Sequence, residues 1–371
     1  MKFSVASGDL QKSLTSIANV VPTKSALPIL ENFLFDLTNS DLKITATDME
    51  VSMMVTLPVK NAQKGKMAVP AKKLADTIRA LPSTQVEFRG DIESNKVEMK
   101  TETGEYKLSG ESSDNYPAVP EIEKGDKLKL TNESLKRLIS KVSFAASTDE
   151  LRPAMTGILF QINKKEIRAV ATDGHRLVRV INTSASSDGG EKEIIVPAKA
   201  LNLFEKVLES AETSVMFDET HAVFSTGNIT LISKIIAEKY PNYESVLPLD
   251  NNKKLTIDRD PLLASVKRTA LYASSTTHQV KFSLKKNSLT VGAEDIDFGS
   301  EARETIPCDY SADAMEIGFN SAYIIEILSH LEADKVEFFF STPSRAVTVK
   351  PEKQPEGEDV LMLVMPVRLN A

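Results

Sequence analysis

The residues most able to do chemistry are Asp173 and His175, in the segment Ala169–Val180, AVATDGHRLVRV. A carboxylate and an imidazole at alternate positions of a strand share a face, so they could act as an acid–base pair. No nucleophile motif accompanies them, and we find no P-loop, no glycine-rich dinucleotide turn and no Gly-x-Ser-x-Gly elbow. We therefore favour a structural or binding role for this turn, with a hydrolase as the alternative.

The other chemically able side chains are few and isolated. His175, His221, His278 and His330 occur singly, without the spacing of metal ligands. The single cysteine, Cys308, excludes an intramolecular disulfide and suits a reducing cytoplasm, where we expect the protein to act. No motif surrounds Cys308, so we interpret it as a partly buried small side chain. The sequence predicts no metal, no cofactor and no catalytic residue.

The segment around Asp173 has the pattern of a β-hairpin. Asp-Gly at 173–174 lies between two apolar, β-branched runs, which is a strong short-range signal for a tight turn. His175, Arg176 and Leu177 crowd against the turn, so its tip offers polar and apolar surface to a partner. A second apolar stretch, 363–369 (LVMPVRL), has no obvious core helix to join. These two segments give the strongest functional indication in the chain.

Composition fits a globular protein of two or three domains, with 371 residues, 41% hydrophobic and 26% charged. No run of about eighteen apolar residues predicts a membrane span. The opening MKFSVASGDL lacks the apolar core of a signal peptide. The net charge of −7 excludes a chain that is basic throughout, but it leaves room for a local basic stripe.

The elements that position these segments recur three times, with a period of about 125 residues. Each copy reads as strand, helix, strands, helix, strands, and Ala-Thr-Asp occurs at both 46–48 and 171–173. Strands outnumber helices and hairpin connections dominate, so we predict an α+β fold with antiparallel sheets. We expect domains at 1–122, 127–250 and 251–371. The stretch 351–358, PEKQPEGE, reads as an exposed charged loop.

Positive charge is concentrated on the predicted helices. The windows 8–21, 71–80, 132–146, 198–210, 261–274 and 320–333 hold eleven basic and seven acidic residues, or +4, which leaves −11 for the rest. The largest contributors are Lys72, Lys73, Arg79, Lys136, Arg137 and Lys141. This bias has the sign expected if the helices face a polyanion, although ordinary solvated helix faces would also give it. Without tryptophan, phosphate contacts suit the chain better than base stacking.

Further phrases carry a family resemblance. They are Met1-Lys2-Phe3, Leu27–Leu30, Thr47–Glu50, Val69–Ala71, Ile195–Pro197 and Met315–Asn320. With the repeats, the Ala-Thr-Asp-Gly-His-Arg-Leu turn and the final Val-Met-Pro-Val-Arg-Leu, the chain resembles the bacterial DNA polymerase III beta subunit family, the sliding clamps, over its full length.

The resemblance implies a processivity factor of the replicative DNA polymerase. In this family, each of two subunits forms a crescent of three clamp domains, and each domain packs two helices on antiparallel sheets. The crescents close head to tail into a six-domain ring. Double-stranded DNA passes through the hole and is held without base readout, and the subunit is a non-catalytic part of the DNA-directed DNA polymerase holoenzyme. A hydrolase using Asp173 and His175, or a scaffold that binds peptides but no DNA, remain alternatives.

The resemblance also implies three sets of site residues. A peptide-binding pocket would contain Met155, Thr172, Gly174, His175, Arg176, Leu177, Pro241, Val246, Ala346, Val364, Met365, Pro366 and Val367. It would receive short peptides, led by glutamine and ending in apolar residues, from the polymerase alpha subunit, the clamp loader, other polymerases and repair proteins. DNA contacts would come from Lys24, Lys72, Lys73, Arg79, Asp149 and Arg152. The dimer interface would include Lys73, Tyr106, Leu271, Tyr272, Glu301 and Glu304.

The sequence departs from the family pattern at several positions. Asp149 replaces a neutral DNA contact, and Pro153-Ala154 stand where some members have tyrosines. Ser245 stands where some members have arginine, beside the expected peptide pocket. The residues 370–371 extend past the usual terminal leucine.

Overall fold

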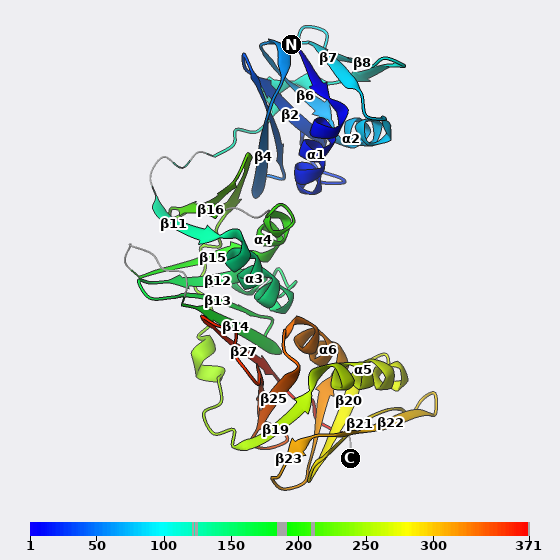
Figure 1. Cartoon of the computed structure of the whole chain (residues 1–371), viewed down its shortest axis with the longest axis vertical. Helices are drawn as coiled ribbons and strands as arrows, with labels where there is room; N and C mark the ends of the chain where they lie inside the picture. Colours follow the sequence, from blue (N-terminus) through cyan, green and yellow to red (C-terminus); the bar gives the residue numbers. More distant parts are fainter. Residues whose placement is uncertain (121, 123–124, 184–190, 209–211, 370–371) are drawn as a thin grey trace. The chain divides into compact units, whose positions relative to one another are not determined.

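The computed structural model describes residues 1–120, 122, 125–183, 191–208 and 212–369 (Figure 1). They form two compact units. The first contains Met1–Leu135 and Lys199–Ile235, and the second contains Lys136–Ala198 and Ile236–Ala371. Every pairing between the described strands is antiparallel. The predicted α+β class with antiparallel sheets is therefore confirmed.

The first unit contains a five-stranded and a nine-stranded sheet. The five-stranded sheet has the order β5 (Lys60–Gln63), β1 (Lys2–Ala6), β7 (Gln85–Asp91), β8 (Lys96–Lys100), β9 (Glu105–Ser109). The nine-stranded sheet has the order β10 (Glu111–Ser112), β6 (Gly65–Pro70), β2 (Asn32–Leu37), β3 (Asp41–Thr47), β4 (Val51–Pro58), β18 (Ile229–Lys234), β17 (His221–Thr226), β16 (Glu212–Phe217), β11 (Asp126–Thr131).

The second unit contains a nine-stranded and a four-stranded sheet. The nine-stranded sheet has the order β15 (Lys192–Pro197), β12 (Gly157–Ile162), β13 (Ile167–Thr172), β14 (Arg176–Asn182), β27 (Glu358–Val364), β26 (Val347–Pro351), β25 (Lys335–Phe340), β19 (Lys253–Asp258), β23 (Asp309–Tyr310). The four-stranded sheet has the order β22 (Ser300–Pro307), β21 (Ser288–Asp295), β20 (Gln279–Lys285), β24 (Met315–Asn320).

Two α-helices occur in each repeat, as the periodicity predicts. They are α1 (Ser7–Ile17), α2 (Ala71–Ala80), α3 (Asn132–Val142), α4 (Ala198–Glu205), α5 (Arg259–Thr269) and α6 (Ser321–His330). Short 3-10 turns connect other elements: η1 (Ala18–Val20), η2 (Pro28–Glu31), η3 (Ser113–Asn115), η4 (Ser143–Ala145), η5 (Pro153–Thr156), η6 (Tyr243–Val246) and η7 (Ala270–Tyr272). Figure 1 shows α5 and α6 side by side; α5 contacts the strands β21 and β22, and α6 contacts β24.

The cores lie between the helices and the sheets. In the first repeat, Leu10 and Leu14 on α1 are fully buried. The rings of Phe3 and Phe88 stack with centroids 4.8 Å apart, and Phe35 lies 5.4 Å from Phe88. Apolar residues on one face of the helix and on alternate strand positions therefore meet in a single layer, as their spacing predicts.

Each nine-stranded sheet is shared by two consecutive repeats. β4 of the first repeat pairs with β18 of the second, and β14 of the second repeat pairs with β27 of the third (Figure 1). All five residues from Val360 to Val364 are buried, so both faces of β27 are covered, and β27 is an inner strand with a neighbour on each side. Within the apolar stretch 363–369, the sheet core thus explains Leu363 and Val364, whereas Met365 lies beyond β27 and is exposed.

Candidate functional site

The hairpin at Asp173 is confirmed, with β13 and β14 joined by the predicted turn. The Asp173 carboxylate accepts hydrogen bonds from the backbone N–H groups of His175 (2.8 Å) and Arg176 (2.9 Å). Thr172 Oγ1 accepts from the Gly174 N–H (3.1 Å) and donates to the Arg176 carbonyl (2.6 Å). Gly174 has a φ of +90°. The carboxylate therefore shapes the turn, which weakens the interpretation of Asp173 and His175 as an acid–base pair.

The Arg176 side chain is held in a cage and is only 9% exposed. Its guanidinium lies between two rings, 5.2 Å from the centroid of Phe144 and 4.8 Å from that of Tyr323. It donates to the Phe144 carbonyl (2.6 Å) and forms an ion pair with Glu326. Burial raises the pKa of the Tyr323 hydroxyl. Arg176 therefore stabilises the turn from its buried side. Its guanidinium N–H groups are hydrogen-bonded to Asp173, Glu326 and the Phe144 carbonyl.

An apolar cluster forms the floor beneath this turn. Its buried members are Ala154, Leu159, Val170, Leu177, Ile195, Tyr240, Tyr243 and Leu363, with Ile236, Leu247 and Ala346 packed against them. Two residues predicted for the peptide pocket, Leu177 and Ala346, belong to it. The Tyr240 hydroxyl donates to the Val170 carbonyl (3.5 Å), and burial raises the pKa of Tyr240.

The predicted pocket residues differ in exposure. The exposed ones are Gly174, His175, Pro241, Val246 and Met365. Ala346, Pro366 and Val367 are half-buried, whereas Met155, Thr172, Arg176, Leu177 and Val364 are buried. Val246 is 54% and Met365 39% exposed, which is unusual for large apolar side chains. Together with the exposed Pro241, these two give the predicted pocket an apolar surface that a partner can reach.

The pairing of β14 with β27 brings the two predicted segments together. Arg176 faces Val364 across the pair, and the Met365 N–H donates to the His175 carbonyl (2.8 Å). The turn and the C-terminal segment, separated widely in sequence, thus form one continuous surface in the second unit. The ring of His175 stacks on that of Tyr323, with centroids 6.1 Å apart.

Five residues that support this surface were not among the predicted pocket residues: Phe144, Tyr323 and Glu326 around Arg176, and the buried Tyr240 and Tyr243. The Tyr-Pro phrase that begins at Tyr240 repeats the one at Tyr116 and was a usable signal. No sequence signal pointed to Phe144, Tyr323 or Glu326, because only the tertiary fold brings η4 and α6 to the turn.

The predicted DNA-contacting residues of the first repeat gather around α2. Lys72 and Lys73 are exposed, and Arg79 forms an exposed ion pair with Asp76 (2.9 Å). A cavity of 690 Å³ between α2 and the loop after α1 is lined by Lys72, Lys73, Asp76 and Arg79. Lys24 is exposed in that loop. These cations lie in the first unit.

Asp149 and Arg152, in the second unit, bind each other. Arg152 Nε donates to the Asp149 carboxylate (2.8 Å). The Leu151 N–H and then Arg152 lower the pKa of Asp149 by hydrogen bonding. A Cβ atom on Gly174 would lie 3.2 Å from Arg152 Nη1, so this guanidinium stands over the pocket turn. The structure therefore places Arg152 beside the Asp173 turn.

The expectation that Arg137 and Lys141 are free to face a polyanion is wrong. Arg137 binds Glu358 and Glu332, and Lys141 is 4% exposed with its ammonium 2.6 Å from the Glu358 carboxylate. The cause is an acidic partner more than 200 positions away in sequence, which no local pattern shows. Of the three cations on α3, Lys136 is the exposed one.

Apart from Lys73, which lies on α2, the predicted dimer-interface residues lie on or beside two sheet edges. Among the described strands, β9 ends the five-stranded sheet and β22 ends the four-stranded sheet. Tyr106 lies on β9 and is half-buried. Leu271 and Tyr272, in η7, are 82% and 45% exposed. Two edges with open backbone groups and a nearby apolar patch are suited to pairing with another chain.

Two of the charged residues predicted for the dimer interface already form ion pairs within the chain. Glu304 accepts two hydrogen bonds from Arg268 (2.7 and 2.6 Å), and these lower its pKa. Glu301 pairs with Arg303 on the same strand. Lys73 is exposed on α2.

No group of three or more His, Cys, Asp or Glu side chains that could hold a metal ion occurs among the described residues. In the same part of the chain, none of the helices has the length and apolar character needed to cross a membrane. Cys308 is half-buried and unpaired, and burial raises the pKa of its thiol, in agreement with the sequence-based interpretation.

Comparison with known families accounts for almost the whole chain. Models of the DNA polymerase III beta subunit match in order, the N-terminal domain at residues 1–120, the central domain at 129–242 and the C-terminal domain at 244–368. The beta sliding clamp of Pseudomonas aeruginosa is 29% identical over 373 residues, and that of Chlamydia muridarum is 26% identical over 374. Both alignments cover 100% of each chain.

Solved structures agree. The DNA polymerase sliding clamp of P. aeruginosa superposes with a TM-score of 0.92 at 29% identity. The sliding clamp of Bartonella birtlesii bound to griselimycin superposes with a TM-score of 0.94 at 27% identity. In both cases 100% of each chain is covered. With three family domains in order over nearly its entire length, the chain belongs to the DNA polymerase III beta subunit family, the sliding clamps.

Proposed function

We propose that this protein is a DNA sliding clamp, a processivity factor that encircles duplex DNA and tethers the replicative polymerase to it. The observation that carries the proposal is the succession of three clamp domains, which matches sliding clamps over the full chain in sequence and in fold. We propose domain boundaries at 1–122, 127–250 and 251–371. The subunit has no chemistry of its own and acts in the cytoplasm.

The ring would close through the two sheet edges. A strand edge of the first repeat and one of the third differ in sequence, so their contact between two copies is head to tail, and two such contacts complete a closed dimer. The exposed β9 and β22 edges and the apolar Leu271 and Tyr272 supply the surfaces. Lys73, Tyr106, Glu301 and Glu304 would lie at the same interface.

DNA would be held by weak contacts to phosphates. Lys24, Lys72, Lys73 and Arg79 provide exposed positive charge around α2, and the chain has no tryptophan for base stacking. Contacts of this kind exchange readily and carry no sequence information, as sliding requires. Asp149 and Arg152 neutralise each other, so their share of DNA binding is expected to be small.

Partner peptides would bind at the surface formed by the turn and the C-terminal segment. Leucine or phenylalanine anchors would pack on Val246 and Met365 above the buried tyrosines, while His175 and the backbone of Gly174 offer polar contacts. We propose the polymerase alpha subunit, the clamp loader, other polymerases and repair proteins as partners. Tethering would raise the local concentration of polymerase at the primer end.

The test is loading onto a nicked circular plasmid by a clamp loader, followed by linearisation. We expect labelled protein to stay with the circle through gel filtration and to leave when the plasmid is cut, because retention is topological. A protein that never stays on the circle would contradict the clamp and favour a peptide-binding scaffold. Turnover by purified protein that disappears in His175→Ala would favour the hydrolase alternative instead.

A further inference from the structure

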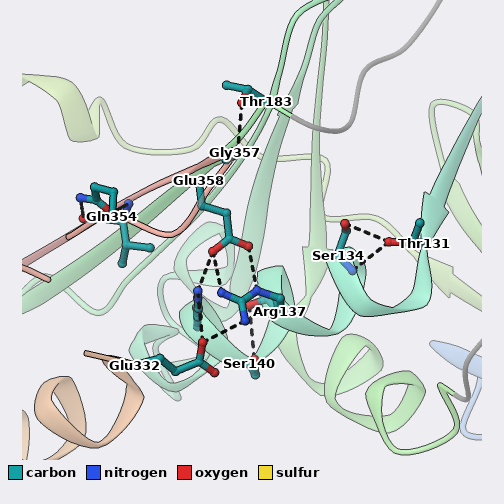
Figure 2. Close-up of polar contacts among 11 residues, drawn as sticks. Thr131, Ser134, Arg137, Ser140, Thr183, Glu332, Gln354, Gly357 and Glu358 are labelled. Atoms are coloured by element: carbon teal, nitrogen blue, oxygen red, sulfur yellow. Dashed lines mark hydrogen bonds and ion pairs between the residues drawn. The ribbon is translucent and has the colours of Figure 1, made fainter. Parts of the chain in front are cut away.

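Four charged side chains form a cluster in the second unit, which we call the α3 ion cluster: Arg137, Lys141, Glu332 and Glu358 (Figure 2). Arg137 grips the Glu358 carboxylate with two parallel bonds, Nε to Oε1 (2.9 Å) and Nη2 to Oε2 (3.0 Å). Lys141 Nζ adds a third bond to Oε2 (2.6 Å). Glu332 closes the cluster on its outer side, 2.9 Å from Arg137 Nη1.

The inner part of this cluster is buried from solvent. The Glu358 side chain is 5% exposed and that of Lys141 4%, whereas Glu332 is 62% exposed. Burial tends to raise the pKa of Glu358, but the bonds from Arg137 and Lys141 outweigh it and keep the pKa below its usual value. Removing one partner of such a set leaves an uncompensated buried charge, so these residues are constrained together.

The backbone that carries Glu358 is fixed as well. Gln354 makes two bonds with the backbone of Val360, donating to its carbonyl (2.9 Å) and accepting from its N–H (2.8 Å). The Thr183 hydroxyl donates to the Gly357 carbonyl (3.2 Å), as Figure 2 shows, and the Thr183 N–H donates to the same carbonyl (2.8 Å). The stretch 351–358, expected to be a solvated loop, is thus exposed along much of its length but ends in a buried anchor.

The cluster connects different repeats. Both cations lie on α3 of the middle repeat, whereas Glu332 follows α6 and Glu358 begins β27, both in the third. At the other end of β27, the cage has the same arrangement, with Arg176 from the middle repeat and Glu326 from the third. Cations of one repeat and carboxylates of the next therefore meet at both ends of the β14–β27 pair.

A continuous series of contacts leads from the cluster to the peptide surface. α3 continues directly into η4, which carries Phe144. The ring of Phe144 stacks on that of His330 (centroids 4.1 Å apart), and its carbonyl accepts from Arg176 (2.6 Å). Arg176 packs on Tyr323, and Tyr323 stacks on His175 at the exposed end.

We propose that Glu358 is a positioning residue for the peptide surface: by holding Arg137 and Lys141 it fixes α3 and η4, so that Phe144 keeps Arg176 and the turn in their binding geometry. Glu358 begins β27 and is separated from the exposed Met365 by the rest of that strand, so it acts through the intervening residues. The inference rests on the proposed peptide-binding function and adds a residue that partner peptides do not touch.

The experiment measures binding of a fluorescein-labelled synthetic peptide, with a glutamine followed by leucine and phenylalanine anchors, by fluorescence anisotropy. We expect Glu358→Gln to raise the dissociation constant about tenfold, a typical size for residues coupled to a site without contacting it. Glu332→Gln is the matched control, because it alters the exposed end of the same cluster, and we expect wild-type affinity. Sedimentation should give wild-type mass for both variants.

A double variant separates positioning from general destabilisation. Glu358→Gln with Lys141→Met removes the buried ammonium that has lost its shorter ion pair and keeps only Glu332 at 3.7 Å, so thermal stability should recover while peptide affinity stays weak. The methyl NMR signal of Met365 should shift in both Glu358→Gln proteins and stay in place in Glu332→Gln. Peptide affinity that recovers together with stability, or wild-type affinity in Glu358→Gln, would overturn the inference. Absence of binding by the wild-type protein would instead overturn the proposed peptide site.

Discussion

Replacing Leu271 and Tyr272 by aspartate should open the proposed ring into monomers. Their exposed fractions are 82% and 45%, and complete burial of a side chain of this kind contributes about 1.5–3 kcal/mol. Covering both at one interface therefore contributes roughly 2–4 kcal/mol. A head-to-tail dimer closed into a ring has two such interfaces, so the loss doubles to roughly 4–8 kcal/mol.

That loss corresponds to a weakening of dimer affinity by a factor of about 10³ to 10⁶. Burying the new carboxylates would add a desolvation cost in the same direction. Sedimentation velocity over a broad range of concentrations measures the shift. Each subunit should remain folded, because exposed substitutions away from special features usually change stability by less than about 0.5 kcal/mol.

Leu249→Asp is the matched control, because Leu249 is fully exposed and lies outside the proposed interface. It should sediment like the wild type. If the Leu271→Asp/Tyr272→Asp protein kept the dimer mass at concentrations where the wild type just begins to dissociate, the assignment of this apolar patch to the ring interface would be wrong.

Further predictions concern the peptide surface and its support. Deleting Met365–Ala371 should abolish binding of the peptide probe while leaving the dimer intact, which calorimetry and sedimentation test. Gly174→Ala should destabilise the protein by about 1 kcal/mol, since φ is +90° and the new Cβ would lie 3.2 Å from Arg152, and should weaken peptide binding; urea unfolding and anisotropy measure the two effects. The pKa of Glu358 lies below its ordinary 4.5, because hydrogen bonds from two cations outweigh burial. The ionised carboxylate therefore contributes to the free energy of unfolding above pH 4.5, and this contribution is lost as the pH falls through the lowered pKa. The urea midpoint should therefore fall less between neutral pH and about pH 3 in Glu358→Gln than in wild type. Calorimetry should give a stoichiometry of one peptide probe bound per chain, and a stoichiometry of two would contradict the single-site assignment.

Local patterns were sufficient to predict the elements and their repetition. The strand–turn–strand around Asp173, the helices with apolar faces and the recurring phrases all depend on neighbours within a few residues. The hydrogen bonds of Asp173 were also within reach, because an aspartate before glycine commonly accepts from the backbone that follows it. These backbone hydrogen bonds occupy the Asp173 carboxylate, and for that reason the acid–base interpretation of Asp173 was the weaker alternative.

The side-chain assignments that failed depended on distant partners. Arg137 and Lys141 look like exposed helix cations, but their anion is 221 and 217 positions away. Whether a cation on an amphipathic helix faces solvent or a buried carboxylate is decided by what packs beside it, and the sequence around the helix does not record that. Val364 similarly lies at a predicted contact position but is fully buried at the end of β27, where the sheet faces are covered by parts of the chain distant in sequence.

The two junctions between repeats show how one scaffold acquires a site. At the first, the Asp48 carboxylate accepts from the N–H groups of Glu50 and Val51, and the Lys234 N–H donates to the Glu50 carbonyl (2.9 Å). These bonds repeat those of Asp173, His175, Arg176 and Met365 at the second junction.

The backbone is therefore conserved between the repeats while the side chains diverge. Met49 has a φ of +76° where the second junction has glycine, and a charged lysine, Lys234, replaces the apolar Met365. The first junction thus has an exposed methionine side chain, Met49, on its turn in place of glycine, and a lysine in place of the apolar Met365. Repetition supplies a turn and a strand pair twice in each chain, and the second junction combines a glycine tip, a caged arginine and an apolar final segment, the features on which the proposed peptide site depends.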